Sequence, residues 1–143
     1  MKNYKHSYAK LAKIAQRYYG DDGFCAVIAL AVGCDISFGK AFHALKREGR
    51  RTGDGTYRYQ QNHALRCFGK RLQHDSVTGG TKTEDCRTLG TVAKRCKDWE
   101  GTYYIYVRGH VACVRDGILE DWSASVTKGS RYRVLDVYKL VEA

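Results

Sequence analysis

The stretch from Gly20 to Cys34 constrains the fold of this chain more than any other. It opens with the turn-forming residues Gly-Asp-Asp-Gly and continues as a run of small and apolar residues from Phe24 to Val32. A helix that is apolar on every side has to be buried, so we expect this run to form a central, buried helix. Asp21 or Asp22 would accept hydrogen bonds from the unpaired N–H groups at its start.

Cys25 falls in the first turn of this expected helix. The unpaired N–H groups and the positive end of the helix dipole stabilise a thiolate at such a position. A thiol there is either a reactive nucleophile or a small core residue. The presence of a base near the thiol would distinguish the first interpretation from the second.

The length and composition suit one compact domain. The chain has 143 residues, of which 43% are hydrophobic and 28% charged, which is enough for a single core. It has no apolar run long enough to span a bilayer, and its basic N-terminus lacks the apolar segment of a signal peptide. We therefore expect a cytoplasmic protein without a membrane partner.

Six cysteines are present, at positions 25, 34, 67, 86, 96 and 113, and no two of them form a Cys-x-x-Cys pair. Because this spacing supports neither a zinc motif nor a redox motif, we expect no metal and no other cofactor. The cysteines are expected to be reduced thiols, with one of them a candidate for catalysis.

The formal net charge of +10 indicates either an acidic partner, such as nucleic acid, or simply a soluble surface. The basic residues are scattered except in the run from Lys46 to Arg51, which leads into a Gly-rich loop. Arg50 and Arg51 would bind a phosphate or a carboxylate there. The loop lacks the Gly-Lys-Ser/Thr ending of a P-loop, and the alternative is an exposed connector.

The first two thirds of the chain show helical periodicity. We expect helices over residues 4–19, 24–33, 38–48, 57–68 and 89–96. Ser37 and Thr56 are the expected N-caps of the third and fourth of these helices. Gly20 and Gly69 follow the first and fourth, as C-terminal glycines do.

The last third changes to residues typical of strands. We expect strands over residues 102–107, 110–115, 118–123 and 131–141, with a short one over 71–77. Helices followed by an antiparallel sheet predict an α+β fold, with the N-terminal helices and the buried nucleophile helix packed on the C-terminal sheet.

The dipeptide Asp116-Gly117 is the strongest hairpin signal in the chain. With a two-residue turn, Asp121 faces Ala112 across the hairpin and is the diagonal neighbour of His110. Since cross-strand partners and alternate residues share a face, His110 and Asp121 are expected on the same side. A turn one residue longer would change this parity.

These residues complete a nucleophile, base and orienting group. His110 would take the proton from Cys25, and Asp121 would fix the tautomer of the imidazole and stabilise its protonated form. Taken singly, a core thiol and a structural histidine are the more frequent interpretations. The combination with Asp121 in this chain order favours the catalytic triad.

The arrangement resembles the papain-like cysteine peptidase fold, in which a Cys near the start of a buried helix precedes a His on one strand and an Asp or Asn on the next. The smaller bacterial double-glycine-leader peptidases are similar, and so is a family of small bacteriophage proteins with a papain-like core. The motifs that carry the resemblance are Cys25-Ala-Val-Ile-Ala-Leu-Ala, the stretch 49–56, Tyr106-Val-Arg-Gly-His110-Val-Ala and Asp116-Gly-Ile-Leu-Glu-Asp121.

The resemblance implies one papain-like domain over residues 1–143, with residues 1–19 as an added amphipathic helix. It implies a cysteine peptidase, or a related thiol acyl-transfer enzyme or hydrolase, that acts on a peptide or protein substrate. The chain would be phage-encoded and would act in the host cytoplasm.

One feature departs from the papain pattern. Papain-like enzymes place a glutamine shortly before the nucleophile, and its side chain donates to the oxyanion. Here the upstream glutamine is Gln16, a weak candidate because it lies several residues too far from Cys25. The backbone N–H of Cys25 would serve instead, together with Asn62, Gln61 or an amide near Asp22. Losing one such donor costs roughly 10²–10³ in rate. The alternative function is therefore a non-catalytic basic protein on the same fold, which binds an acidic host protein or nucleic acid.

Overall fold

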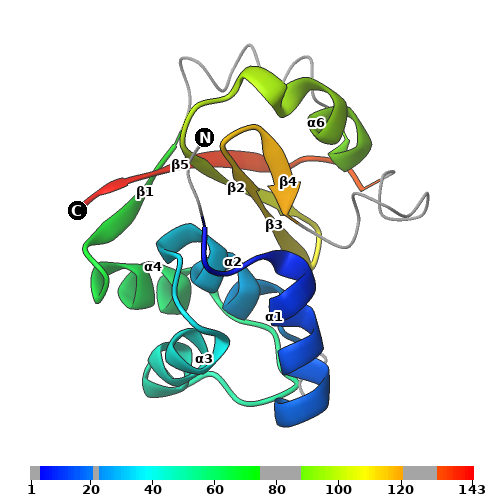
Figure 1. The fold of residues 1–143 in the computed structure, drawn as a ribbon. Coiled ribbons are helices and arrows are strands. Elements are labelled where there is room, and N and C mark those ends of the chain that lie inside the picture. The colour runs from blue at the N-terminus through cyan, green and yellow to red at the C-terminus, as the bar shows by residue number, and fades with distance from the viewer. Residues whose placement is uncertain (1–3, 21–22, 75–87, 121–131) are drawn as a thin grey trace. The chain divides into compact units, whose positions relative to one another are not determined.

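The computed structural model describes residues 4–20, 23–74, 88–120 and 132–143. The chain divides into two compact units, one formed by Met1–Arg71 with Glu142–Ala143 and the other by Leu72–Val141. Figure 1 shows helices in the first unit and a sheet with a helix in the second. The predicted α+β class is confirmed, whereas the single papain-like domain stays a prediction.

The first unit is built around one buried helix. Its elements are α1 (Tyr8–Ile14), the π-helical turn η1 (Ala15–Tyr19), α2 (Cys25–Cys34), α3 (Phe38–Arg47) and α4 (Arg58–Arg66). Helix α2 packs against α1, α3 and α4. All of its residues from Ala26 to Val32 are buried, which confirms the expected central helix.

Of the four expected helix ends, two are confirmed, Thr56 is wrong, and Gly69 lies two residues beyond Cys67, the C-cap of α4. The hydroxyl of Ser37 caps α3 by accepting a hydrogen bond of 3.1 Å from a backbone N–H three residues on. Gly20 ends η1 in the left-handed region, with φ of 57°. The N-cap of α4 is Tyr57 and not Thr56, because the Gln60 side chain turns back and accepts from the Tyr57 N–H at 2.9 Å.

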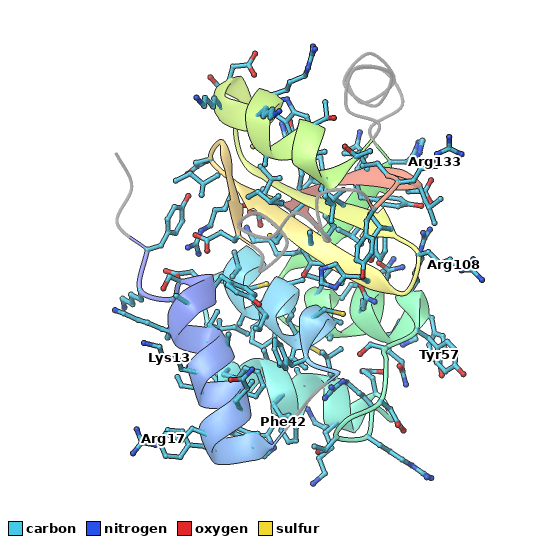
Figure 2. The ribbon with its side chains drawn as sticks, turned by 90° about the vertical axis from the view of Figure 1, so that its right-hand side faces the viewer. Lys13, Arg17, Phe42, Tyr57, Arg108 and Arg133 are labelled. Atoms are coloured by element: carbon cyan, nitrogen blue, oxygen red, sulfur yellow. The ribbon has the colours of Figure 1, made fainter. Side chains whose placement is uncertain are left out.

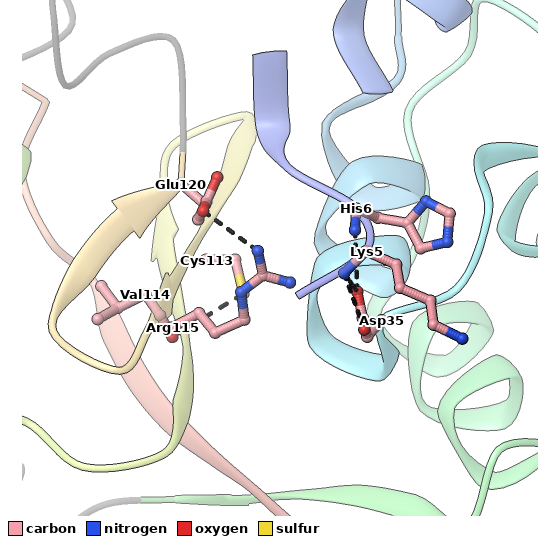
Figure 3. Close-up of polar contacts among 7 residues, drawn as sticks. All are labelled: Lys5, His6, Asp35, Cys113, Val114, Arg115 and Glu120. Atoms are coloured by element: carbon pink, nitrogen blue, oxygen red, sulfur yellow. Dashed lines mark hydrogen bonds and ion pairs between the residues drawn. The ribbon is translucent and has the colours of Figure 1, made fainter. Parts of the chain in front are cut away.

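The first helix is shorter than expected. It begins at Tyr8, because the segment before it is held by a residue distant in sequence. The backbone N–H groups of Lys5 and His6 both donate to the carboxylate of Asp35, at 3.1 Å each (Figure 3). Tyr18, near the end of this helical segment, is 70% exposed.

The second unit holds most of the sheet. Its elements are α6 (Leu89–Arg95), the 3₁₀ turn η2 (Cys96–Asp98), β2 (Thr102–Val107), β3 (His110–Arg115), β4 (Ile118–Glu120) and β5 (Asp136–Glu142), while β1 (Lys70–His74) crosses from the first unit. The described strands form one sheet in the order β1-β5-β2-β3-β4. The pairs β2–β3, β2–β5 and β3–β4 are antiparallel, and β2 and β3 have the predicted bounds.

A hydrophobic cluster joins one face of this sheet to α6. It contains Leu89, Val92, Cys96, Trp99, Tyr103, Ile105, Val107, Ala112, Val114, Leu119, Val134 and Val137. Leu135, by contrast, is 54% exposed. It precedes β5, so the strict alternation of a strand does not yet apply to it.

Candidate functional site

Cys25 is the first residue of α2 and is partly exposed, whereas the seven residues that follow it are buried. The N-cap is Phe24, whose side chain makes no capping hydrogen bond, and Asp21 and Asp22 lie outside the described residues. The dipole of this ten-residue helix therefore acts on the sulfur without a carboxylate at the N-cap. This placement favours a thiolate at Cys25.

Cys34 lies at the opposite end of the same helix and is likewise partly exposed. Burial raises the pKa of its thiol from 9.0 to about 11, although Lys70 acts to lower it. A raised pKa lowers the thiolate fraction on which nucleophilic attack by Cys34 would depend. Cys34 serves as an internal reference for an inert thiol.

We expect iodoacetamide to alkylate Cys34 of the folded protein about 100-fold more slowly at mildly alkaline pH than an exposed thiol of ordinary pKa. The reason is that each unit by which the pKa rises lowers the thiolate fraction tenfold. Mass spectrometry of the cysteine peptides over a time course measures the rate. Equal rates for Cys34 in folded and urea-unfolded protein would contradict this expectation.

The other described cysteines lie in two different settings. Cys67 is exposed, Cys96 and Cys113 are buried, and Cys86 lies outside the described residues. Cys67 is therefore the exposed thiol against which the reactivity of Cys25 is compared.

The turn before Cys25 is held by the Gly-rich loop that follows α3. Arg50 is only 5% exposed, and its Nη2 donates to the carbonyl oxygen of Gly23 at 2.6 Å. A Cβ on Gly23 would lie 2.7 Å from the carbonyl oxygen of Asp54 and 2.8 Å from that of Gly53. Arg50 is thus a positioning residue for the backbone that leads into α2, a role that the sequence pattern did not predict.

His110 is the first residue of β3 and lies opposite Val107 of β2. The two strands are joined by the tight turn Arg108-Gly109, in which Gly109 has φ of 71°. Alternation places His110 on the face of Ala112 and Val114, which belong to the cluster that includes α6. The histidine is itself partly exposed, so its ring stands at the border of this packed face.

The hairpin that leads to Asp121 has the predicted two-residue turn. Asp116 has φ of 47° and Gly117 has φ of 83°, both left-handed, as a type I′ turn requires. The two strands pair so that Val114 faces Leu119, which confirms the predicted register. Asp121 itself lies outside the described residues, so its place beside the histidine stays a prediction.

The opposite face of the hairpin carries an ion pair. Nη2 of Arg115 lies 3.3 Å from Oε1 of Glu120 (Figure 3). The side chain of Arg115 is 4% exposed and that of Glu120 is 16% exposed. Glu120 therefore points away from the face of His110, as the predicted register requires.

The predicted oxyanion donors differ in exposure. Gln16 is exposed in η1, and Asn62 is exposed on α4. Gln61 is 6% exposed, and its Nε2 donates to the carbonyl oxygen of Thr56 at 3.1 Å. An oxyanion role for these three side chains stays a prediction.

The two arginines predicted to bind an anion line one cavity of about 500 Å³. Arg51 is exposed, whereas Arg50 is buried and also holds Gly23. The cavity is completed by Gly49, Asp54, Gly55, Thr56, Tyr57 and Gln60.

Cys25 belongs to the first compact unit and His110 to the second, so their pairing stays a prediction. Within the part of the chain that the structure describes, no three His, Cys, Asp or Glu residues gather as metal ligands would. Across the same residues, no individual helix has both the length and the apolar character needed to cross a membrane.

Comparison of the chain with protein-family models, with curated proteins and with solved structures found no match. The resemblance to papain-like peptidases and to phage proteins therefore stays a prediction.

Proposed function

We propose that this protein is a thiol hydrolase of the papain type that acts on peptide or protein substrates. Cys25 is the nucleophile, His110 the base and Asp121 the group that orients the imidazole. The observation that carries the proposal is the setting of Cys25, an accessible thiol at the first residue of a helix that is otherwise buried. The setting of His110 supports it, since a partly exposed ring at the start of a rigid strand suits a base.

The proposed reaction has two steps, acylation of the sulfur and hydrolysis of the thioester. The imidazole of His110 takes the proton of Cys25, and the sulfur attacks the carbonyl carbon of the substrate. The C–N bond then breaks, the imidazolium gives its proton to the leaving amine, and a thioester remains on the sulfur. A water molecule, deprotonated by the same imidazole, attacks the thioester, which releases the carboxylic acid and restores the thiol.

The charge on the carbonyl oxygen needs a donor in the transition state. The backbone N–H of Cys25 lies in the first turn of α2, where N–H groups point along the helix axis toward an anionic ligand. Such N–H groups stabilise an oxyanion without reorganising during the reaction. The rigid core around α2 keeps this donor in place.

The test is selective alkylation near pH 6, with iodoacetamide as the probe. We expect Cys25 to react on the order of 100-fold faster than the exposed Cys67, because a thiolate at a helix start paired with an imidazole persists at this pH. Mass spectrometry of the cysteine peptides gives each rate. Urea-unfolded protein is the control, in which the two cysteines should react alike.

A rate for Cys25 equal to that of Cys67 in the folded protein would overturn the proposal. A fast rate that persists in a His110→Ala variant would instead leave the helix as the cause and remove His110 from its role.

A further inference from the structure

Two exposed tyrosines stack on each other at the start of α4. Tyr57 is 72% exposed and Tyr59 is 56% exposed. Their ring centroids are 5.8 Å apart, and the ring planes differ by only 12°. Tyr57 projects outward from α4 (Figure 2). Because neither ring is needed in the core, the pair presents a flat aromatic surface to a ligand.

Tyr57 also lines the cavity of about 500 Å³ that contains Arg50 and Arg51. The hydroxyl of Thr56, which lines the same cavity, is buried and makes no hydrogen bond with the part of the chain that the structure describes. Buried polar groups are nearly always satisfied, so this hydroxyl offers a hydrogen bond to a bound molecule.

A second cavity has a volume of about 580 Å³, and some of its lining residues are close in sequence to those of the first. It is lined by Lys40, His43, Lys46, Arg47 and Phe68, with no acidic side chain among them. The two cavities flank Glu48, since residues 46–47 line one and residues 49–51 line the other. The Glu48 carboxylate lies 3.2 Å from Nδ1 of His63, whose ring in turn contacts that of Tyr59.

The charge of this region is strongly one-sided. Residues 38–66 contain seven Lys and Arg residues against two Asp and Glu residues, which gives a net +5 of the +10 that the whole chain carries. Half of the net charge therefore lies in about a fifth of the sequence. A cationic surface of this kind attracts phosphates and makes binding depend on salt.

We propose that this surface binds single-stranded nucleic acid. We call it the tyrosine–cation face, and it consists of Lys40, Lys46, Arg47, Arg51, Tyr57 and Tyr59. Unpaired bases stack on the tyrosine rings, and the backbone phosphates lie at the cations. A duplex keeps its bases stacked on one another and cannot use the rings. A run of Asp and Glu residues would match the charge, but their side chains have no flat ring to stack on the tyrosine pair.

The proposal is independent of the thiol chemistry, because no residue of the tyrosine–cation face belongs to the proposed triad. A Cys25→Ala variant should bind nucleic acid as the unmodified chain does. Failure of hydrolysis and failure of binding are therefore separate results.

The experiment is fluorescence anisotropy of a labelled oligothymidylate of about 12 nucleotides, titrated with the full chain at several salt concentrations. We expect binding that weakens steeply with salt. Replacing Tyr57 or Tyr59 with alanine should weaken it about 5- to 150-fold, whereas Tyr57→Phe should restore it because phenylalanine still stacks. Tyr18→Ala is the matched control, since Tyr18 is also exposed, at 70%.

The cations are tested through the salt dependence. The triple variant Lys40→Ala, Lys46→Ala, Arg47→Ala should reduce the slope of log K against log salt by about 2, since each phosphate contact on a single strand contributes about 0.7. The double variant Lys94→Ala, Arg95→Ala removes exposed charge from α6 and should leave this slope unchanged. Circular dichroism melts establish that every variant is folded.

Three outcomes would overturn the proposal. The first is no binding of the oligothymidylate at low salt. The second is binding that is unaffected by either tyrosine substitution, which would show attraction by charge alone. The third is equal binding of poly-glutamate, with the same response to the variants, which would assign the surface to an acidic protein.

Discussion

A His110→Ala variant is expected to hydrolyse peptides about 10⁴- to 10⁶-fold more slowly than the unmodified chain, if measured on the same substrate. The loss is large because nucleophile and base act as one unit, and removing either one disables both. A pool of peptides from a digested proteome, analysed by mass spectrometry after incubation, supplies a substrate without knowledge of the specificity. The peptide cleaved most rapidly is then used for rates.

The double variant Cys25→Ala, His110→Ala makes this prediction sharper. Its rate should equal that of either single variant, because the second substitution removes a group that no longer acts. His43→Ala and Cys34→Ala are the matched controls, one an exposed histidine on α3 and the other the partly exposed cysteine at the end of α2, whose pKa burial raises. A His110→Ala variant that cleaves at the original rate would show that His110 has no role in the mechanism. Losses that add in the double variant would show that Cys25 and His110 act independently.

Gly117→Ala is expected to destabilise the protein by about 2–5 kcal/mol, a large effect for the addition of one methyl group. Gly117 has φ of 83°, which costs an alanine roughly 1–2 kcal/mol. In addition, its Cβ would lie 2.6 Å from the carbonyl oxygen of Lys97 in η2. Moving that backbone adds roughly 1–3 kcal/mol.

Gly109→Ala separates the two contributions. Gly109 also occupies the second position of a two-residue hairpin turn and has φ of 71°, but a Cβ there would have no atom within 4 Å. It should cost only the conformational part, roughly 1–2 kcal/mol. Thermal melts followed by circular dichroism compare the variants, with about 2–4 °C of Tm for each kcal/mol. Equal melting temperatures for the two variants would show that the Cβ at position 117 in the β3–β4 turn does not clash with the backbone of η2.

The elements that the sequence predicted well are those specified by local pattern. The apolar run of α2 indicates a buried helix, and the β-branched and aromatic run of β2 indicates a strand. The burial and the bounds of both elements were therefore predicted nearly correctly. The register of the β3–β4 hairpin followed in the same way, since Asp116-Gly117 specifies its own turn.

The errors lie where distant residues decide the local structure. The Asp35 carboxylate accepts hydrogen bonds from the backbone of Lys5 and His6, about thirty positions away in the sequence. These two residues are therefore not helical, although their sequence pattern is. The Gln60 side chain selects Tyr57 as the N-cap of α4, although Thr56 is the better cap by residue type.

The candidate site shows the same division. The position of Cys25 at the start of a buried helix follows from the local sequence, and the partly exposed place of His110 follows from its hairpin. The role of Arg50 could not be predicted, because its hydrogen bond to Gly23 joins residues 27 positions apart. An arginine after one helix and a glycine before another are the only signals that sequence offers for it.

Arg50 lines a cavity and also binds the carbonyl oxygen of Gly23, which stands two residues before Cys25. A molecule that binds Arg50 in that cavity acts on the same guanidinium that holds the start of α2. Thermodynamic linkage makes such an effect reciprocal. If a ligand in the cavity changes the equilibrium for ionising the Cys25 sulfur by some factor, ionising the sulfur changes the affinity for that ligand by the same factor.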